Sequence, residues 1–286
     1  MTVSASPVVR RRRLAAELRR LRLAASKTLD DAAEHLECSA TKVSRIESGH
    51  VGARIQDVRD LVELYAVTGP EREALLDLVR QARRKGWWHA YADMISDSFQ
   101  TLIGMEDEAT TIWTYENHLI PGLLQIPGYS RALMTTRPDT PLDLIERGLR
   151  LRATRQSVLT REHGPQLSAV IDEAALRRGA GGPQVMDEQY EHLIVMTNSP
   201  TVTVQVLPLA AGAHPGGSFP FVILGFADPA DPRVAYAELL TAEFYLDRAE
   251  DVGRYLAEFD YLRGTALTPA DSLTLIRHLQ QECRSG

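Results

Sequence analysis

Apolar residues recur at helical spacing through the first part of the chain. Leu14, Leu18 and Leu21 follow one another at intervals of four and three, as on the buried face of a helix. Residues that cap or end helices interrupt the pattern at short intervals. It predicts five short helices: one from Pro7 to about Leu23, one capped by Thr28, one capped by Ser39 and ended by Gly49, one over 55–65 and one opened by Pro70. Residues 1–85 are therefore expected to form a small all-α domain.

From Trp87 onward, strand patterns appear among further helical stretches. Residues 201–206 alternate strictly and place three valines on one face, which is typical of a half-buried strand. Strands are also expected at 166–171, 218–226 and 233–239, and helices at 88–103, 129–136, 141–160, 183–198, 249–264 and 269–282. Because most of these strands are not separated by helices, residues 87–286 are expected to form an α+β domain with an antiparallel or mixed sheet. The whole chain is thus expected to be α+β.

The chain has 286 residues, enough for two domains, and its charge is unevenly distributed. Residues 1–90 hold 17 Lys and Arg against 12 Asp and Glu, whereas the remainder holds 15 against 26. A basic first part joined to an acidic remainder indicates that the first part meets a polyanion such as nucleic acid.

The composition also bears on the compartment. No apolar run approaches the roughly 18 residues that a membrane helix needs, and the first residues lack the apolar core of a secretory signal. The two cysteines, Cys38 and Cys283, lie far apart, which argues against a disulfide scaffold. We therefore expect a cytoplasmic protein that is associated with the nucleoid.

Residues 28–49 carry the pattern with the clearest chemistry. Two short helices meet at a tight turn near Glu37, and Val43 and Ile46 face inward from the second helix. A helix in the major groove reads base edges with residues of its first turns, while hydroxyls, helix N-termini and basic side chains bind phosphates. The expected DNA contacts are Ala40, Thr41, Lys42 and Arg45 on the outer side of this helix, Ser39 and Ser48 at its ends, Arg54 just beyond it, and Arg11, Arg12 and Arg13 in the first helix.

Two alternatives stay open for this region. Short helix pairs of the same shape occur in all-α domains that bind no DNA, and the arginines at 10–13 would also suit the solvated start of a helix. The basic surplus of the first part and the outward positions of Lys42 and Arg45 favour DNA binding, because each side chain can donate to guanine O6 and N7.

The octapeptide Lys42-Val43-Ser44-Arg45-Ile46-Glu47-Ser48-Gly49 resembles the end of a Cro/C1-type (XRE-like) helix-turn-helix. The resemblance implies a partly buried ion pair between Glu47 and Arg22 of the first helix, with a structural role. Two positions depart from the pattern of that family: Leu29 replaces its usual glutamine, and Glu37 replaces the glycine of the turn. A left-handed backbone at Glu37 would cost on the order of 1 kcal/mol.

Further motifs follow one another in the second part. They are Trp87-Trp88, Tyr115-Glu116 and the segments 119–125, 129–132, 172–178 and 203–208. This series resembles the large C-terminal domain of actinobacterial WhiJ-like regulators, which are often described as antitoxin-like. The resemblance implies transcription regulation, often beside a gene for a small acidic partner protein, and it implies no known ligand or reaction.

The second part shows no pattern for catalysis or for a cofactor. Its histidines lack the spacing of metal ligands, and His278 with Cys283 makes only a weak two-ligand pair. The adjacent Asp172 and Glu173 suit helix capping or an arginine partner such as Arg177 better than acid–base chemistry. We therefore expect no enzyme activity, no metal and no cofactor.

The apolar loop at 119–129 allows two interpretations. Surface loops are usually polar, so this one either packs onto its own domain or meets a partner or ligand. The loop at 210–218 could border the same place.

The sequence as a whole predicts a sequence-specific DNA-binding transcription regulator. One recognition helix spans few base pairs, so we expect a homodimer on a near-palindromic operator in double-stranded DNA. The second domain would control DNA binding through a small partner protein or a ligand. The alternative is an antitoxin-like protein that sequesters a small partner protein and binds DNA for autoregulation; an enzyme with a DNA-binding appendage has the least support. Activation and repression look alike at this level.

Overall fold

The computed structural model describes residues 6–214 and 219–285, and the chain falls into two compact units. The first unit comprises Met1–Ala92, Phe99–Glu108 and Asp228–Asp231. The second comprises Asp93–Ser98, Ala109–Ala227 and Pro232–Gly286. The first unit therefore extends past the boundary expected near residue 85 and includes two segments from later in the chain.

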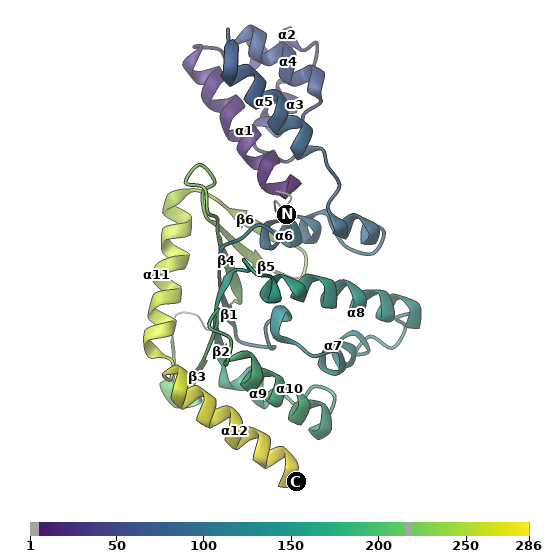
Figure 1. Cartoon of the computed structure of the whole chain (residues 1–286), viewed down its shortest axis with the longest axis vertical. Coiled ribbons are helices and arrows are strands. Elements are labelled where there is room, and N and C mark those ends of the chain that lie inside the picture. The colour runs from purple at the N-terminus through teal and green to yellow at the C-terminus, as the bar shows by residue number, and fades with distance from the viewer. Residues whose placement is uncertain (1–5, 215–218, 286) are drawn as a thin grey trace. The chain divides into compact units, whose positions relative to one another are not determined.

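The five helices expected in the first unit are present. They are α1 (Pro7–Ala24), α2 (Leu29–His35), α3 (Ala40–Glu47), α4 (Ile55–Leu64) and α5 (Gly69–Ala82), as Figure 1 shows. A reciprocal capping box starts α2: the Thr28 hydroxyl accepts from the Asp31 N–H at 3.1 Å, and the Asp31 carboxylate accepts from the Thr28 N–H at 2.7 Å. The helix expected over 88–103 is instead split into η1 (Trp87–Tyr91) and α6 (Asp97–Glu106).

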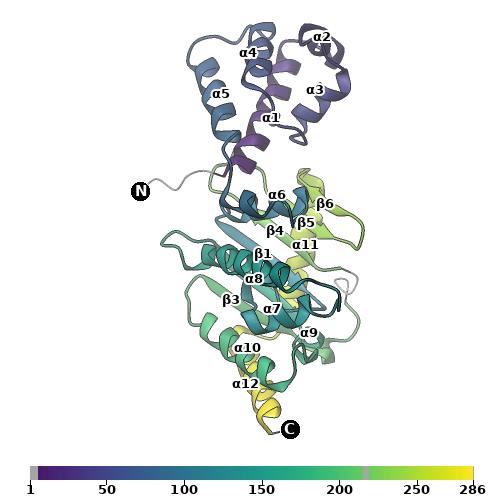
Figure 2. The same cartoon turned by 90° about the vertical axis from the view of Figure 1, so that its right-hand side faces the viewer.

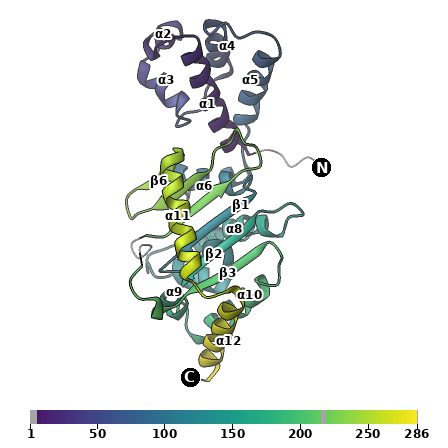
Figure 3. The same cartoon turned by 90° about the vertical axis from the view of Figure 1, so that its left-hand side faces the viewer.

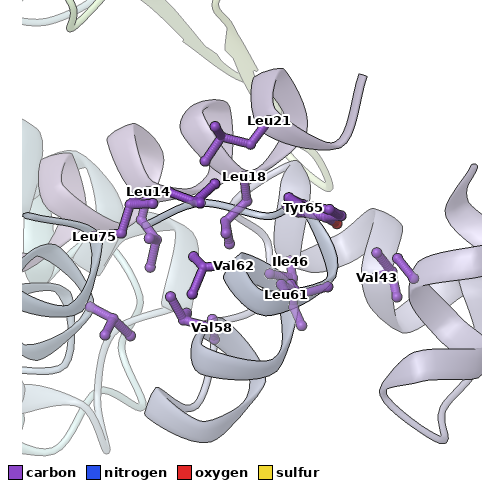
Figure 4. Close-up of a cluster of buried hydrophobic side chains, with 14 of the residues drawn as sticks. Leu14, Leu18, Leu21, Val43, Ile46, Val58, Leu61, Val62, Tyr65 and Leu75 are labelled. Carbon is purple, nitrogen blue, oxygen red and sulfur yellow. The ribbon is translucent and has the colours of Figure 1, made fainter. Parts of the chain in front are cut away.

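Apolar side chains from all five helices form one core in the first unit. Leu18, Val43, Val58 and Leu61 each have no exposed surface, and Figure 4 shows them converging between the helices. Burial of one such side chain stabilises the fold by roughly 1.5–3 kcal/mol. The core therefore fixes the positions of the short helices α2 and α3, which could not persist alone.

The turn between α2 and α3 carries backbone strain. Glu37 has a φ of 49°, in the left-handed region that favours glycine. The chain then returns to α2 through a hydrogen bond from the Cys38 N–H to the Ala33 carbonyl at 2.9 Å. The departure from glycine at this position thus does not prevent the turn.

The second unit is built on a six-stranded sheet with the order β3-β2-β1-β4-β5-β6. The strands are β1 (Thr111–Glu116), β2 (Gln166–Asp172), β3 (Val202–Leu207), β4 (Phe221–Gly225), β5 (Val234–Glu238) and β6 (Glu243–Leu246). β1, β2 and β3 are parallel, and β4, β5 and β6 each pair antiparallel with the preceding strand in that order. The predicted α+β class with a mixed sheet is confirmed. Ser218, the first residue of the strand expected at 218–226, lies outside the described residues.

Helices cover both faces of this sheet. They are η2 (Gly122–Leu124), α7 (Pro127–Met134), α8 (Leu142–Gln156), η3 (Ser157–Thr160), α9 (Glu173–Arg177), α10 (Pro183–Met196), η4 (Leu209–Ala211), α11 (Ala249–Thr265) and α12 (Pro269–Ser285). Figures 1 and 3 show α11 against one face of the sheet, with α7, α8, α9 and α10 on the other side. Under α11, Tyr115, Val170 and Phe221 of the sheet pack with Phe259 of the helix.

Candidate nucleic-acid interface

The helix α3 has two opposite faces. Val43 and Ile46 are buried in the core of the first unit, while Thr41, Ser44, Arg45 and Ser48 are exposed. The exposed residues follow one another at intervals of three, one and three, so they share one side of the helix. The apolar side fixes the rotation of α3, and the polar side is left for contact with another molecule. Figure 2 shows α3 in the first unit.

Local hydrogen bonds fix the two ends of α3. At its beginning, the Ser39 Oγ accepts from the Lys42 N–H at 3.2 Å, as an N-cap does. Just past its end, the Ser48 hydroxyl donates to the Arg45 carbonyl at 3.2 Å and lies 2.8 Å from His50 Nδ1. Both serines are exposed, so each remains in reach of a phosphate at its end of the helix.

An ion pair ties α3 to α1. Arg22 donates from Nε and Nη2 to the two carboxylate oxygens of Glu47, at 2.8 and 2.9 Å. The Arg22 side chain is 9% exposed and that of Glu47 is 4% exposed. Nη1 of Arg22 also donates to the Lys27 carbonyl at 2.9 Å. This bidentate pair stands where the resemblance to the Cro/C1-type family implies it, and it anchors the end of α3 rather than contacting bases.

Tyr65, at the end of α4, belongs to the same core. Burial raises the pKa of its phenol; the Glu47 carboxylate adds to the shift and Arg22 opposes it. The low exposure of Arg22 and Glu47 themselves is the condition under which bidentate bonds are strong.

Two of the expected base contacts lie differently from the prediction. Lys42 is turned toward α4, where its Nζ lies 3.5 Å from Asp57 Oδ2, and its side chain is 38% exposed. Ala40 is partly buried and packs against the core of the first unit. The reason is rotation of the helix: the start of α3 faces α2 and α4, so the outward side begins at Thr41. Arg45 has no ion-pair partner among the described residues.

The arginines at the start of α1 also have structural partners. Arg13, expected at the DNA, donates from Nε and Nη2 to the carboxylate of Asp231 at 2.9 and 2.5 Å, and Asp228 lies 2.5 Å from Nη2. These bonds raise the pKa of Arg13, the Asp231 bond most, against the effect of burial. Arg10 pairs with Glu108 at 2.7 Å. The Arg13 guanidinium is thus held between two carboxylates of its own unit.

The other expected phosphate contacts are placed as follows. Arg11 and Arg12 are half-buried, beside Gly52 and Gly49 of the segment that follows α3. Arg54 is exposed at the beginning of α4, where its N–H donates to Asp57 Oδ2 at 3.3 Å. Arg54 therefore remains near α3 with its side chain in solvent.

Sequence reasoning missed Ser44 and His50, both exposed beside Arg45 and Ser48. Ser44 lies one helical step from each of Thr41 and Ser48, and that spacing was the available signal. His50 follows the helix in an irregular segment, where periodicity gives no information about which way a side chain points.

In the second unit, the apolar loop at 119–129 packs onto its own unit. Ile120, Leu124 and Tyr129 are at most 1% exposed, and the Tyr129 hydroxyl accepts from the Ile120 N–H at 3.2 Å. The Gln189 amide donates to the Leu124 carbonyl at 2.8 Å. The structure therefore agrees with the first interpretation of this loop, in which it packs onto its own domain.

The acid pair expected to be structural has local partners. Asp172 begins α9 and accepts from the Ala174 N–H at 2.8 Å, and Glu173 accepts from Arg177 Nε at 2.7 Å.

No group of three His, Cys, Asp or Glu among the described residues is placed to hold a metal ion.

Glu116, at the end of β1, titrates near neutral pH. Burial raises the pKa of its carboxyl to about 7; Arg155 on α8 opposes this shift, Glu238 adds to it and Arg152 opposes it. A change of charge at this position therefore falls within the range of ordinary buffers.

The geometry of α2 and α3, with a buried apolar side and an exposed polar side on the second helix, defines a helix-turn-helix domain of a DNA-binding regulator. Residues 13–75 match a family described as a helix-turn-helix domain. Residues 99–278 match the family described as domain of unknown function DUF5753, and the chain belongs to this family. Neither a curated protein nor a solved structure matches the chain.

Within the described residues, no helix combines the length and the apolar character needed to cross a membrane.

Proposed function

We propose that the chain is a sequence-specific transcription regulator that places α3 in the major groove of its operator. The observation that carries the proposal is the exposed side of α3, formed by Thr41, Ser44, Arg45 and Ser48, on a helix whose other side is locked in the core. Arg45 reads guanine through O6 and N7. Ser39, Ser48 and Arg54 hold phosphates on either side and set the register.

The regulator binds DNA as a homodimer on a near-palindromic site. A single helix reads three or four base pairs at best, too few for useful specificity in a genome, and two copies one turn apart double the readout. Light scattering of the full chain with operator DNA measures the stoichiometry. Two chains per operator support the proposal, and one chain at saturation contradicts it.

The second unit controls the first and carries no enzyme activity. The support is the series of motifs that resembles WhiJ-like, antitoxin-like regulators, together with the excess of acidic residues after residue 90. In this account, the Cro/C1-type reader responds to a small partner protein or a ligand bound by the second unit. The second candidate function is sequestration of such a small protein, with DNA binding used for autoregulation.

Coexpression of the full chain with the product of an adjacent small gene separates these two functions. A stable complex that no longer binds the operator favours sequestration with autoregulation. A complex that binds the operator with altered affinity favours a regulator controlled by its partner.

The DNA proposal is tested with the full chain and two DNAs: a site selected from a random pool by the wild-type protein, and a random duplex. Arg45→Ala is expected to weaken binding of the selected site by about 1–3 kcal/mol and to affect the random duplex less. Arg80→Ala removes the same charge from α5, where Arg80 pairs with Asp77, and it should leave the ratio of the two affinities unchanged. Equal losses on both DNAs for Arg45→Ala would contradict the assigned role.

A further inference from the structure

The carboxyl ends of β1 and β2 lie side by side in the second unit. Glu116 pairs with Ile171 in the parallel register, so Tyr115 and Asp172 come at the same end of the sheet. β1 pairs with the parallel β2 on one side and with the antiparallel β4 on the other. In open sheets with parallel strands, ligands bind outside the carboxyl ends of those strands.

Three polar atoms at this end of the sheet have no hydrogen-bond partner among the described residues. They are Tyr115 Oη, His214 Nδ1 and Glu258 Oε1, and all three are buried. Tyr115 has no exposed surface at all. A buried polar group without a partner costs about 1–3 kcal/mol, so three of them in one region need an explanation.

The three atoms belong to one cluster. The Tyr115 and His214 rings meet edge to face with centroids 6.2 Å apart, and His214 Nε2 lies 3.5 Å from Asp172 Oδ2. Burial raises the pKa of the Tyr115 phenol, and the charges of Asp172 and Glu258 add to the shift. Asp172 lies at the end of β2 beside His214. Glu258 lies on α11, whose Tyr255 ring meets Phe221 next to Tyr115.

The cluster is rich in acceptors. If Nε2 of His214 carries the proton toward Asp172, Nδ1 is an acceptor. Glu258 Oε1 and the lone pairs of Tyr115 Oη are acceptors as well. No lysine or arginine pairs with Asp172 or Glu258 in the part of the chain that the structure describes. Within the described residues, Asp172 is met by the Ala174 N–H and by His214 Nε2, and Glu258 Oε1 by no hydrogen-bond donor.

Aromatic rings form one side of the cluster. The Phe221 ring lies 5.8 Å from that of Tyr115 and 5.2 Å from that of Tyr255 on α11. Aromatic faces attract cations. Figure 3 shows α11, which contributes Tyr255 and Glu258, lying over the sheet.

We propose that Tyr115, His214 and Glu258, with Asp172 behind His214, bind the primary ammonium group of a small organic cation. A primary ammonium has three N–H donors, which match the three acceptors without partners, and its charge is met by the carboxylates and the aromatic rings. A metal ion fits less well, because the described residues contain no group of three His, Cys, Asp or Glu placed to hold one.

This inference deepens the proposed control of the first unit by the second, since it names the chemical class of the ligand. The binding test uses no DNA. A failure to bind the cation therefore leaves the role of α3 intact, and a failure of Arg45→Ala to alter specificity leaves this site intact.

The test is binding of propylammonium to the full chain, measured by saturation-transfer NMR and by titration calorimetry. Propanol replaces the ammonium by an uncharged group, and tetramethylammonium keeps the charge without any N–H donor. We expect saturable binding of propylammonium, no binding of propanol, and tetramethylammonium binding weaker by about tenfold or more. Absence of propylammonium binding, or equal binding by either control compound, would overturn the proposal.

Variants locate the site. Tyr115→Phe and Glu258→Gln each remove one acceptor or its charge while keeping the shape of the side chain, and each should weaken propylammonium binding by about tenfold or more. The matched controls are Tyr190→Phe, which removes a buried hydroxyl bonded to the Leu176 carbonyl, and Glu188→Gln on the exposed side of α10. Both controls should bind as the wild type does. Binding that survives in Tyr115→Phe and Glu258→Gln places the cation elsewhere and overturns the assignment.

Discussion

Removal of Glu47 tests whether the Arg22–Glu47 pair holds α3 in place. Glu47→Ala would leave the Arg22 side chain, only 9% exposed, with the Lys27 carbonyl as its remaining hydrogen-bond acceptor among the described residues. Breaking a buried ion pair from one side costs about 3–5 kcal/mol, because the other charge stays buried without its partner. The free energy of opening of the first unit should fall by that amount.

An exposed ion pair in the same unit provides the matched control. Arg20 and Glu71 lie 2.8 Å apart, like Arg22 and Glu47, but both side chains are 54% exposed. Arg20 also keeps a second partner in Glu17. Solvent screening limits such a pair to about 0–1 kcal/mol, so Glu71→Ala should have a small effect.

Hydrogen exchange of the α3 amides, followed by mass spectrometry in the full chain, reports opening of this unit by itself. Glu47→Ala should lower protection by about a hundredfold to several thousandfold, since each 1.4 kcal/mol corresponds to about tenfold. The double variant Arg22→Met with Glu47→Leu should recover most of it, because apolar side chains replace both charges. Protection in Glu47→Ala no lower than in Glu71→Ala, or a double variant as labile as the single one, would show that the Arg22–Glu47 pair does not hold α3 in place.

Two further predictions concern stability. Glu37→Gly should stabilise the first unit by about 1 kcal/mol in thermal unfolding, because φ at this position is 49°. The control Glu34→Gly, inside α2, should destabilise the unit by a similar amount. Loss of stability in both variants would show that the backbone at Glu37 is not strained. The Glu116 pKa is raised from 4.5 to about 7 in the folded chain. Between pH 4.5 and about pH 7 the folded state therefore binds a proton that the unfolded state has lost. The second unit should lose stability as the pH rises through this range, by up to about 3 kcal/mol in total. Glu116→Gln should flatten this dependence, and an unchanged slope in the variant would assign it to other groups.

The helices of the first unit were predictable because their signals are local. Thr28 and Ser39 accept hydrogen bonds from amides within three residues of themselves, so the sequence near each cap determines where a helix begins. Apolar positions such as Leu18 and Val43 then identify the buried side. None of these signals depends on distant parts of the chain.

Two strands of the second unit could not be predicted in this way. β1 has buried residues on both faces, with Ile112 and Thr114 on one and Tyr115 on the other, so strict alternation is absent. β6 has only four residues at the edge of the sheet. Because β1 was missed, the parallel arrangement of β1, β2 and β3 was missed with it.

The two sides of α3 were predictable, whereas the partners of particular side chains were not. The spacing of Val43 and Ile46 placed Arg45 outside, but it did not show that Lys42 lies 3.5 Å from Asp57 on α4. The partners of Arg13, Asp228 and Asp231, come from more than 200 residues further along the chain. No local pattern encodes a contact over such a separation.

Dimethyl sulfate probing of the bound operator shows whether α3 enters the major groove, because it distinguishes guanine N7 in the major groove from adenine N3 in the minor groove. We expect protected guanine N7 atoms in each half-site, with the protection lost in Arg45→Ala and retained in Arg80→Ala. Protection confined to adenine N3 would exclude α3 from the major groove, and guanine protection unchanged in Arg45→Ala would exclude Arg45 as the residue that reads guanine.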